Sequence, residues 1–412
     1  MHKLRFLLYS LLGNSCRFLQ PWWTASEWGQ IAGYFAGRNL AQAAATLEQC
    51  VCRLAHSKYA LGLNLGRSAI QVALEAFDFP RGSEVILPSF SCAGVIMPVL
   101  QAGLEPVLAD VDRDFNLSAP GVAAALGPKT RAVVLAHLSG KFARDTGEIL
   151  SLAKSRHLRV IEDACQAFGL QKDGKWAGTF GDAGIFSFGL GKNLFGPGGG
   201  MLITGDDAVI SSAWRRALLP EDPWGVRLRV AKFAIRYGFP PAAVWGRGVA
   251  KLKELCRPSP EATLQSFAYP VRRLSDIDAA LALCQVERHQ EIIRRRQANA
   301  RALLASGALE GTGLDLPDPG DHIFTKFLLS TTGNHQAALS LQEMLQSRGI
   351  ETEPSYVPLH LRPAFARFRR RALPETERRW SGAFSLPVHP RLGPKEMDRI
   401  ISVLQRFTGK RR

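Results

Sequence analysis

The sequence has no apolar run that approaches the ~18–20 residues of a membrane-spanning helix. It also lacks an internal repeat and a low-complexity tract, which argues against repeat and disordered architectures. Its seven cysteines are scattered, and Cys50 and Cys52 stand too close together for an ordinary disulfide or a CxxC metal site. We therefore expect reduced thiols, a cytoplasmic location and no metal centre.

The N-terminus resembles a secretion signal only in part. A basic start precedes the apolar stretch 4–12, but Asn14 and Arg17 interrupt it and no clear cleavage site of small residues follows. We favour an amphipathic N-terminal helix over secretion, and we treat residues 1–22 as an arm.

The composition is that of a folded but strongly basic chain. The 412 residues are 46% hydrophobic, with a formal net charge of +16 and a pI of about 9.9. Such a charge fits either an anionic partner or an ordinary basic enzyme. A nucleic-acid-binding protein would need a recognisable module or exposed stacking aromatics on a basic face, and neither is found, so no nucleic-acid partner is expected.

Strand-like and helix-like segments alternate through the first half of the chain, which predicts an α/β domain with a mainly parallel sheet. We place this large domain at 23–218 and a smaller α+β domain at 266–412. The expected helices include 38–56, 146–156 and one long helix from 279 to 303, and the expected strands include 59–65, 84–90, 105–112, 130–137, 158–163 and 324–330.

The segment 219–265 breaks this rhythm. Arginines and lysines are interleaved with apolar residues there, and Glu254 is the only acid between 227 and 257. Such a segment suits an anionic membrane interface, and together with the arm it suggests contact with the inner face of the membrane. The alternative is a basic helix pair packed on the body of the protein.

Two residues suggest the chemistry. Asp163 ends an apolar strand, and Lys192 lies in a glycine-rich turn after the next strand. A carboxylate and an amine at neighbouring strand ends suit pyridoxal phosphate, whose ring nitrogen needs an acid and whose aldehyde needs a lysine. The lysine must lose its proton near neutral pH for this purpose.

Further side chains could complete such a site. Gln166 would lie beside Asp163, and Phe90 could stack on the cofactor ring. A phosphate could be held at the start of a helix by a glycine turn, two hydroxyls and backbone amides, from Gly66, Arg67, Ser68, Ala69 and Ser187. Taken singly, each of these residues has a purely structural alternative, such as a helix cap or a core side chain.

As a set, the motifs resemble the DegT/DnrJ/StrS family of sugar aminotransferases, which are pyridoxal-phosphate enzymes of fold type I. The resemblance covers roughly 25–215 and 266–408. It rests on the runs Gly66-Arg67-Ser68-Ala69, Glu84 to Phe90, Asp110-Val111-Asp112, His137 to Gly140, Ile161 to Ala167, Gly181 to Phe188, Lys192-Asn193-Leu194 with Gly198 to Gly200, Pro358-Leu359-His360 and Ser385-Leu386-Pro387.

The resemblance implies a large domain with a seven-stranded sheet, a homodimer with shared sites, and a role for each site residue. Lys192 becomes the Schiff-base lysine, Asp163 the partner of the ring nitrogen and Gln166 a ring contact. Ser68 and Ser187 become phosphate contacts, and the candidates for substrate binding are His137, Arg273 and His360. The reaction would move an amino group from an amino acid, usually glutamate, to a nucleotide-linked or lipid-linked ketosugar.

One departure from the family pattern concerns the partner subunit. Val271 stands where the family usually has an asparagine that reaches the neighbour's phosphate, so Arg272 replaces that contact or the contact is lost.

Two alternatives to an aminotransferase stay open at this point. One is another fold-type I reaction, such as decarboxylation or acyl transfer, and the other is a scaffold that has lost turnover.

Overall fold

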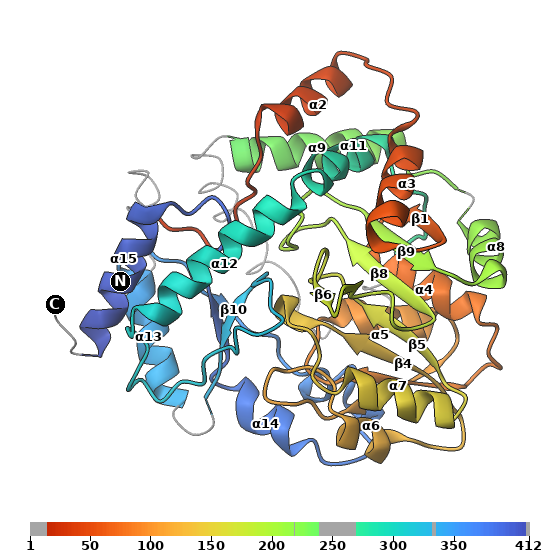
Figure 1. Cartoon of the computed structure of the whole chain (residues 1–412). Coiled ribbons are helices and arrows are strands. Elements are labelled where there is room, and N and C mark those ends of the chain that lie inside the picture. Colours follow the sequence, from red (N-terminus) through yellow and green to blue (C-terminus); the bar gives the residue numbers. More distant parts are fainter. Residues whose placement is uncertain (1–14, 218, 239–268, 332–334, 409–412) are drawn as a thin grey trace.

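A computed structural model describes residues 15–217, 219–238, 269–331 and 335–408. In these ranges the chain forms a large unit built on a seven-stranded sheet and a smaller unit built on a three-stranded sheet (Figure 1). The helix α12 (His289–Ala305) runs from the large unit to the small one.

The central sheet has the strand order β1-β9-β8-β5-β4-β2-β3. The five neighbouring strands β3, β2, β4, β5 and β8 pair in parallel, whereas β9 is antiparallel to both of its neighbours, β8 and β1. The strands are β1 (Tyr59–Leu63), β2 (Glu84–Pro88), β3 (Glu105–Ala109), β4 (Thr130–Ala136), β5 (Arg159–Asp163), β8 (Ala183–Ser187) and β9 (Gly200–Thr204). The prediction of a mainly parallel seven-stranded sheet is confirmed.

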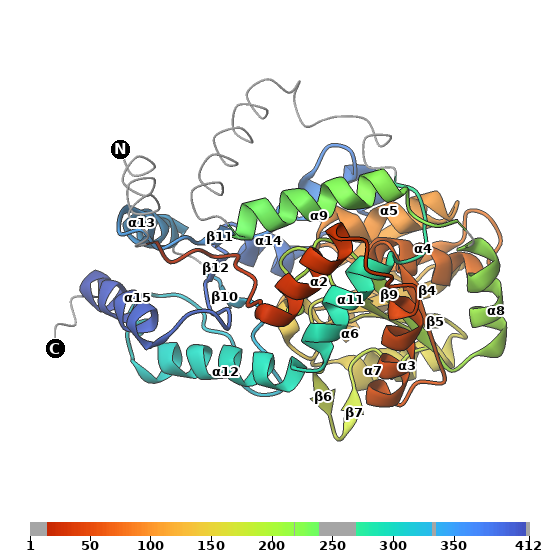
Figure 2. The ribbon, with the colours of Figure 1, turned by 90° about the horizontal axis from the view of Figure 1, so that it is seen from above.

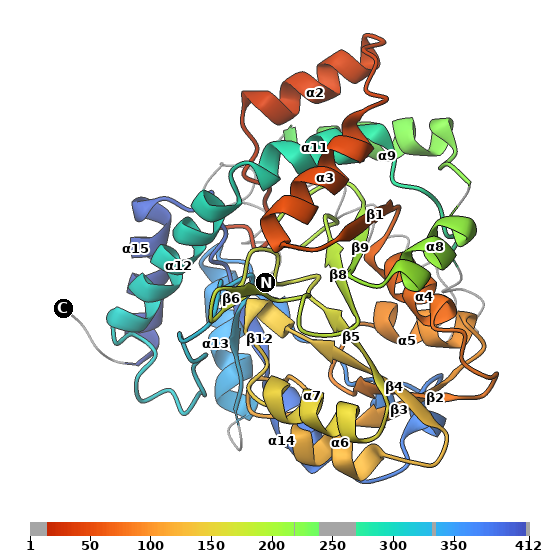
Figure 3. The same cartoon turned by 45° about the vertical axis from the view of Figure 1, so that its right-hand side comes forward.

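Helices cover both faces of this sheet because its strands bury side chains on both sides (Figure 3). In β2, for example, Val85 and Leu87 point toward one helical layer and Ile86 toward the other. The first layer is α4 (Gly66–Ala76), α5 (Ala93–Gln101) and α8 (Asp207–Arg216). The second is α3 (Ala43–Ala55), α6 (Ala119–Ala125), α7 (Thr146–Ser155) and α11 (Asp276–Val286).

Local sequence signals place several helix ends. Thr24 caps α2 (Ala25–Phe35) in a capping box with Glu27, which lies in the first turn of the helix. The helix predicted at 38–56 begins only at Ala43, because Leu40 precedes a turn. The long helix predicted from 279 to 303 is wrong in its middle: α11 ends at Val286, and α12 starts in a new direction at His289.

The small unit packs helices on a sheet of order β10-β12-β11. The strands of this sheet are β10 (Phe327–Leu329), β11 (Glu353–Pro354) and β12 (Phe384–Leu386). The helices of this part of the chain are α13 (His335–Ser347), η3 (Leu359–Leu361), η4 (Ala366–Phe368), α14 (Pro374–Trp380) and α15 (Pro394–Phe407). Its apolar core joins the sheet to α12, α13 and α15. Two short strands, β6 (Gln171–Lys172) and β7 (Lys175–Trp176), form a separate ribbon on the large unit, and η1 (Leu138–Gly140) follows β4.

The N-terminal segment 15–20 is extended rather than helical where the structure describes it. Cys16 forms an isolated parallel bridge with Ile350, so the first described residues lie on the small unit, and the chain then crosses to the large unit at α2 (Figure 2). The predicted helical arm therefore does not extend through these residues, and the rest of it, at 1–14, lies outside the described residues.

The basic segment is described only as far as α9 (Pro223–Gly238). One face of α9 is buried through Val226, Val230, Phe233 and Tyr237 against α2, α11 and Phe195. This packing fits the alternative of a helix on the body of the protein. The opposite face is exposed, and the prediction for 239–265 lies outside the described residues. None of the helices in the described ranges has the length and apolar character needed to cross a bilayer.

Candidate active site

The carboxyl end of β5 carries two acids that point to opposite faces of the sheet, because side chains alternate along a strand. Asp163 faces the α4 side, and its Oδ1 accepts a hydrogen bond of 3.1 Å from the backbone N of Cys165. Glu162 is fully buried on the other side, where its carboxylate accepts backbone hydrogen bonds from Gly178 and Gly181. Only Asp163 is therefore available to a ligand.

Lys192 lies half-buried in the turn after β8, near Asp163, Cys165 and Tyr356. Burial alone lowers the pKa of its amine. The thiols of Cys165 and Cys92, the phenol of Tyr356 and the Asp163 carboxylate outweigh that effect, so the net shift of the Lys192 pKa is upward. This shift is opposite in direction to the lowered pKa that the sequence argument asked for.

The start of α4 is shaped to receive an anion. Its N-cap residue, Leu65, makes no capping bond through its side chain, so the first-turn amides are left without a side-chain acceptor. Gly66 is required there, because a Cβ atom at this position would lie 2.9 Å from Cys165 Sγ and 3.4 Å from Ser187 Oγ. The first turn of α4 also carries Arg67, whose guanidinium lies over the ring of Tyr269 at 5.2 Å.

Ser68 does not face this anion site as expected. It is fully buried, and its hydroxyl donates a hydrogen bond of 2.8 Å to Oδ1 of Asn64. The same Oδ1 of Asn64 accepts a hydrogen bond of 3.2 Å from the backbone N of Arg272. Nδ2 of Asn64 donates a hydrogen bond of 3.0 Å to the carbonyl oxygen of Pro270. Ser68 thus helps to fix the segment that contains Val271 against α4, and Ala69 is buried in the core behind it.

Gln166 and Phe90 share Tyr356 as a neighbour. The backbone N of Ser139 donates to Gln166 Oε1 at 2.9 Å, and Gln166 Nε2 donates to Tyr356 Oη at 3.4 Å. Phe90 is buried and meets the ring of Tyr356 edge to face at 5.9 Å. Both members of the predicted pair therefore contact Tyr356.

The three candidate substrate residues occupy structural positions in this chain. His137 is fully buried, with Nε2 at 2.9 Å from Glu162 and Nδ1 accepting from the backbone N of Ala143. Its placement favours a role in the core over a substrate contact.

The other two candidates also have protein partners. His360 is buried, with Nδ1 at 2.5 Å from Ser89 Oγ and Nε2 at 3.2 Å from Glu377. Burial lowers the pKa of His360. Arg273 is ion-paired with Glu48 at 3.2 Å and lies over the ring of Trp214 at 4.0 Å.

Sequence reasoning missed the roles of Tyr356, Asn64 and the two thiols near Lys192. Tyr356 stands two residues before the run Pro358-Leu359-His360, but its contact with Gln166 spans 190 residues of sequence. Burial raises the pKa of Tyr356, and it raises the pKa of Cys165 well above its usual range. Cys165 therefore stays a neutral thiol that packs against Gly66. The six cysteines in the described ranges are all free.

These residues fit pyridoxal phosphate. The uncapped start of α4 with Ser187 suits the phosphate, Asp163 suits a protonated ring nitrogen, and Lys192 suits the aldehyde. Gly66 allows the start of α4 to pack closely against Cys165 and Ser187, which brings its backbone amides near the Ser187 hydroxyl.

A sequence model of the DegT/DnrJ/EryC1/StrS aminotransferase family matches residues 37–219 and 253–405. Among solved structures, DesV of S. venezuelae is 27% identical, with a TM-score of 0.72, and the match covers 93% of this chain and 94% of DesV. The family model passes over the part of the basic segment between 219 and 253.

Two more distant structures share the fold. PseC of Helicobacter pylori, an aminotransferase involved in the biosynthesis of pseudoaminic acid, is 18% identical, with a TM-score of 0.77 and coverage of 96% and 99% of the two chains. NtdA of Bacillus subtilis, solved with bound cofactor PMP, is 21% identical, with a TM-score of 0.71 and coverage of 94% and 83%. The chain belongs to the DegT/DnrJ/EryC1/StrS aminotransferase family and is a pyridoxal-phosphate-dependent aminotransferase.

Proposed function

We propose that this enzyme transfers an amino group from an amino acid, glutamate being the expected donor, to the keto group of a sugar carried on a nucleotide or a lipid. The observation that supports this most directly is the convergence of Lys192, Asp163 and Gln166 beside the uncapped start of α4. Bound pyridoxal phosphate supplies a carbonyl that accepts the amino group and a ring that withdraws electrons from the substrate.

The chain's residues would divide the remaining work. Lys192 takes the Cα proton of the donor and returns a proton in the second half of the reaction. Asp163 would keep the ring nitrogen of the cofactor protonated. Gln166, which hydrogen-bonds to Ser139 and Tyr356, would fix the orientation of the cofactor ring. Phe90 and the small unit close the site against water.

Absorbance tests the chemistry. The purified enzyme should show a band near ~410–430 nm that disappears on addition of glutamate, and Lys192→Ala should lack the band. A panel of ketosugars with mass detection of the aminated product then identifies the acceptor. A band that survives in Lys192→Ala would refute the assignment of the lysine, and release of carbon dioxide would indicate a decarboxylase.

We also propose a peripheral contact with anionic membranes through α9. Trp224, Leu228 and Ile235 are 78%, 55% and 54% exposed and follow one another at helical spacing, beside the exposed cations Lys232 and Arg236. The gap of the family model over this region supports a function particular to this chain. Absence of binding to anionic liposomes at low salt would rule this contact out.

A homodimer is proposed from the family resemblance. The segment 270–272, which is expected to face the partner, is held against the start of α4 by Asn64. Light scattering during gel filtration should give the mass of two chains, whereas the mass of one chain would exclude shared sites.

A further inference from the structure

An open groove lies between α9 and the turn that carries Lys192, and we call it the α9 groove. Leu190 and Pro197 line it from the turn, and residues of α9 line it from the helix. Its volume is about 350 Å³. Since a water molecule occupies ~30 Å³ of the liquid, this groove has room for a ligand of many atoms.

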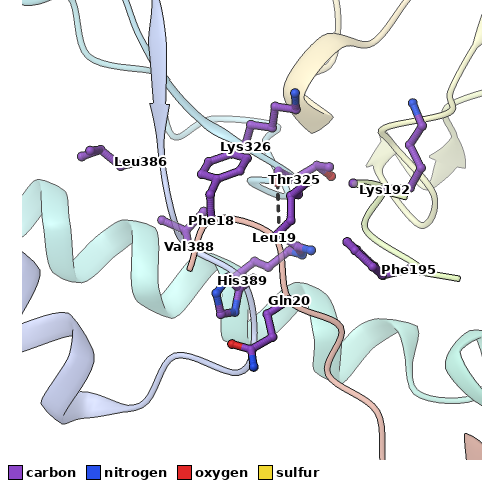
Figure 4. Close-up of a pocket in the computed structure, with 12 residues that line it drawn as sticks. Phe18, Leu19, Gln20, Lys192, Phe195, Thr325, Lys326, Leu386, Val388 and His389 are labelled. Atoms are coloured by element: carbon purple, nitrogen blue, oxygen red, sulfur yellow. Dashed lines mark hydrogen bonds between the residues drawn. The ribbon is translucent and has the colours of Figure 1, made fainter. Parts of the chain in front are cut away.

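The other side of the same turn is closed (Figure 4). Leu19 of the N-terminal segment lies 3.5 Å from where a Cβ atom of Gly191 would stand. The cavity between this segment and Lys192 has a volume of about 10 Å³, which is room for about one water. Arg296 lines this cavity, but it is buried and donates from Nη1 to the carbonyl oxygen of Thr325 at 3.1 Å, without an ion pair to any acid in the described ranges. A bulky ligand therefore cannot approach the turn from this side.

Apolar side chains form much of the α9 groove. Leu190 and Leu228 line it and are 51% and 55% exposed, and Phe233 lines it from the buried face of α9. Two large aliphatic side chains that remain half exposed in one groove leave an apolar surface in contact with water. Covering this surface with an apolar ligand is favourable.

The charged side chains of the α9 groove are all cationic. Arg229, Lys232 and Arg236 line it, and no acid of the described ranges does. Arg229 is ion-paired with Glu221 and Asp278. Lys232 and Arg236 are exposed, and neither has an ion pair with an acid in the part of the chain that the structure describes. Because these two cations are four residues apart on one helix, they lie on the same face and can bind one anion together.

The groove suits a lipid phosphate better than a nucleotide. The base and ribose of a nucleotide need hydrogen-bond partners, but apart from the three cations the described groove offers one polar side chain, that of Tyr237, which is only 8% exposed. An aliphatic chain needs no such partners and would cover Leu190 and Leu228. Its phosphate would accept charge-assisted hydrogen bonds from Lys232 and Arg236.

We propose that the α9 groove binds the lipid phosphate to which the acceptor sugar is attached, an inference that rests on the proposed function. Leu190 stands two residues before Lys192, so a lipid in the groove passes beside the turn that holds the reacting amine. The attached sugar is thereby brought toward Lys192 from the open side of the turn. The acceptor is then a lipid-linked ketosugar.

Calorimetric titration of the cofactor-loaded enzyme with decyl phosphate, below its micelle concentration and without vesicles, tests this site. The combined substitutions Lys232→Gln and Arg236→Gln should weaken binding about 10- to 100-fold, the effect of losing charge-assisted hydrogen bonds. Arg227→Gln is the matched control on the same helix, because Arg227 lies over the rings of Tyr34 and Phe35 and does not line the groove. It should bind like the wild type. Unchanged affinity of the double variant would overturn the proposal.

A second pair of variants separates the lipid site from a general contact of α9 with membranes. Leu190→Asp should retain the absorbance band of the bound cofactor but weaken decyl phosphate binding at least 10-fold, because a carboxylate would face the phosphate and apolar surface would be lost. Trp224→Ser, outside the groove, should reduce binding to anionic liposomes and leave decyl phosphate binding unchanged. Equal loss of decyl phosphate binding in both variants would show that the groove is not the site.

Inorganic phosphate, decanol and UDP are titrated in parallel. Phosphate and decanol should each bind more weakly than decyl phosphate, since each supplies only part of the contacts. Tighter binding of UDP, with the same dependence on Lys232 and Arg236, would refute a lipid carrier, and so would a wild-type enzyme that does not bind decyl phosphate because a second copy covers the groove. If no amino acid changed the absorbance band, the proposed function would fail, whereas these titrations would still decide on the groove.

Discussion

The amide nitrogen of Gln166 donates a hydrogen bond of 3.4 Å to the hydroxyl of Tyr356, so a side chain of the large unit meets one of the small unit beside Lys192. The same hydroxyl lies 3.5 Å from Nζ of Lys326. Tyr356 therefore links the residue expected to touch the cofactor ring to the part of the chain that closes over it.

Removal of this hydroxyl should slow the enzyme without emptying the cofactor site. For Tyr356→Phe we expect a 3- to 10-fold slower loss of the absorbance band with glutamate, the cost of about one neutral hydrogen bond. Stopped-flow absorbance measures this rate, and Tyr34→Phe on α2 serves as the control. A wild-type rate would show that the hydroxyl does not position Gln166.

Asp163→Asn keeps the shape of the side chain but removes its charge. We expect cofactor binding to persist and the donor half of the reaction to slow about 10²-fold or more, because the ring nitrogen loses the carboxylate that keeps it protonated. Asp173→Asn, in the exposed turn between β6 and β7, should retain full activity. An active Asp163→Asn enzyme would contradict the assignment of Asp163.

Gly66→Ala tests the close packing at the start of α4. The added methyl group would lie 2.9 Å from Cys165 Sγ. We expect about 1–3 kcal/mol less stability and weaker cofactor retention after dialysis, since the core behind Cys165 is close-packed. Gly29→Ala, at an open position on α2, should leave stability unchanged or slightly raise it. Tight cofactor binding by Gly66→Ala would show that the phosphate lies elsewhere.

The acid sensitivity of the fold should depend on His322. Burial and the nearby charge of Lys141 lower the pKa of His322 to about 3. Nδ1 of His322 accepts a hydrogen bond of 3.0 Å from the backbone N of Phe324. A histidine that is neutral when folded binds a proton more readily when unfolded. Its stabilising effect is therefore complete above pH ~6.5 and is lost as the pH falls from there toward 3.

For this residue we expect the free energy of unfolding to fall between pH 7 and pH 5 by about 2 kcal/mol more in the wild type than in His322→Asn. Urea titrations at the two pH values measure the difference. His157→Asn, at an exposed position, should keep the wild-type pH dependence. Identical pH dependence in His322→Asn and the wild type would mean that His322 is not neutral in the fold.

Much of the central site could be predicted from local sequence. Apolar strands that end in Asp163 and Ser187, and a glycine before α4, are signals contained within a few residues. The seven-stranded sheet brings them together because parallel strands place their carboxyl ends along one edge. The burial of Glu162 on the opposite face was not predicted, although the alternation of side chains along β5 explains it.

The remaining features depend on contacts between distant parts of the chain. Ser68 looked like a phosphate contact because it lies at the start of a helix after a glycine turn, and His137 was a substrate candidate from the resemblance. Asn64 and Glu162 bind these two residues inside the protein. Similarly, nothing near Arg296 in the sequence indicates that it is buried without an acid. The helix expected at 279–303 failed because the pattern of apolar residues continues through the break at 287–288.

The hydrogen bonds that join Cys16 to Gly349 and Glu351 have a consequence for the order of folding. The ribosome makes the first of these residues long before the last two, and the hydrogen bond from Phe18 to Glu351 spans 333 positions. The large unit can fold during synthesis, but the wall that Leu19 forms beside Lys192 cannot be in place until the small unit has been made. Nascent chains that end before residue 349 would therefore lack the hydrogen bonds that hold Cys16 and Phe18 on the small unit.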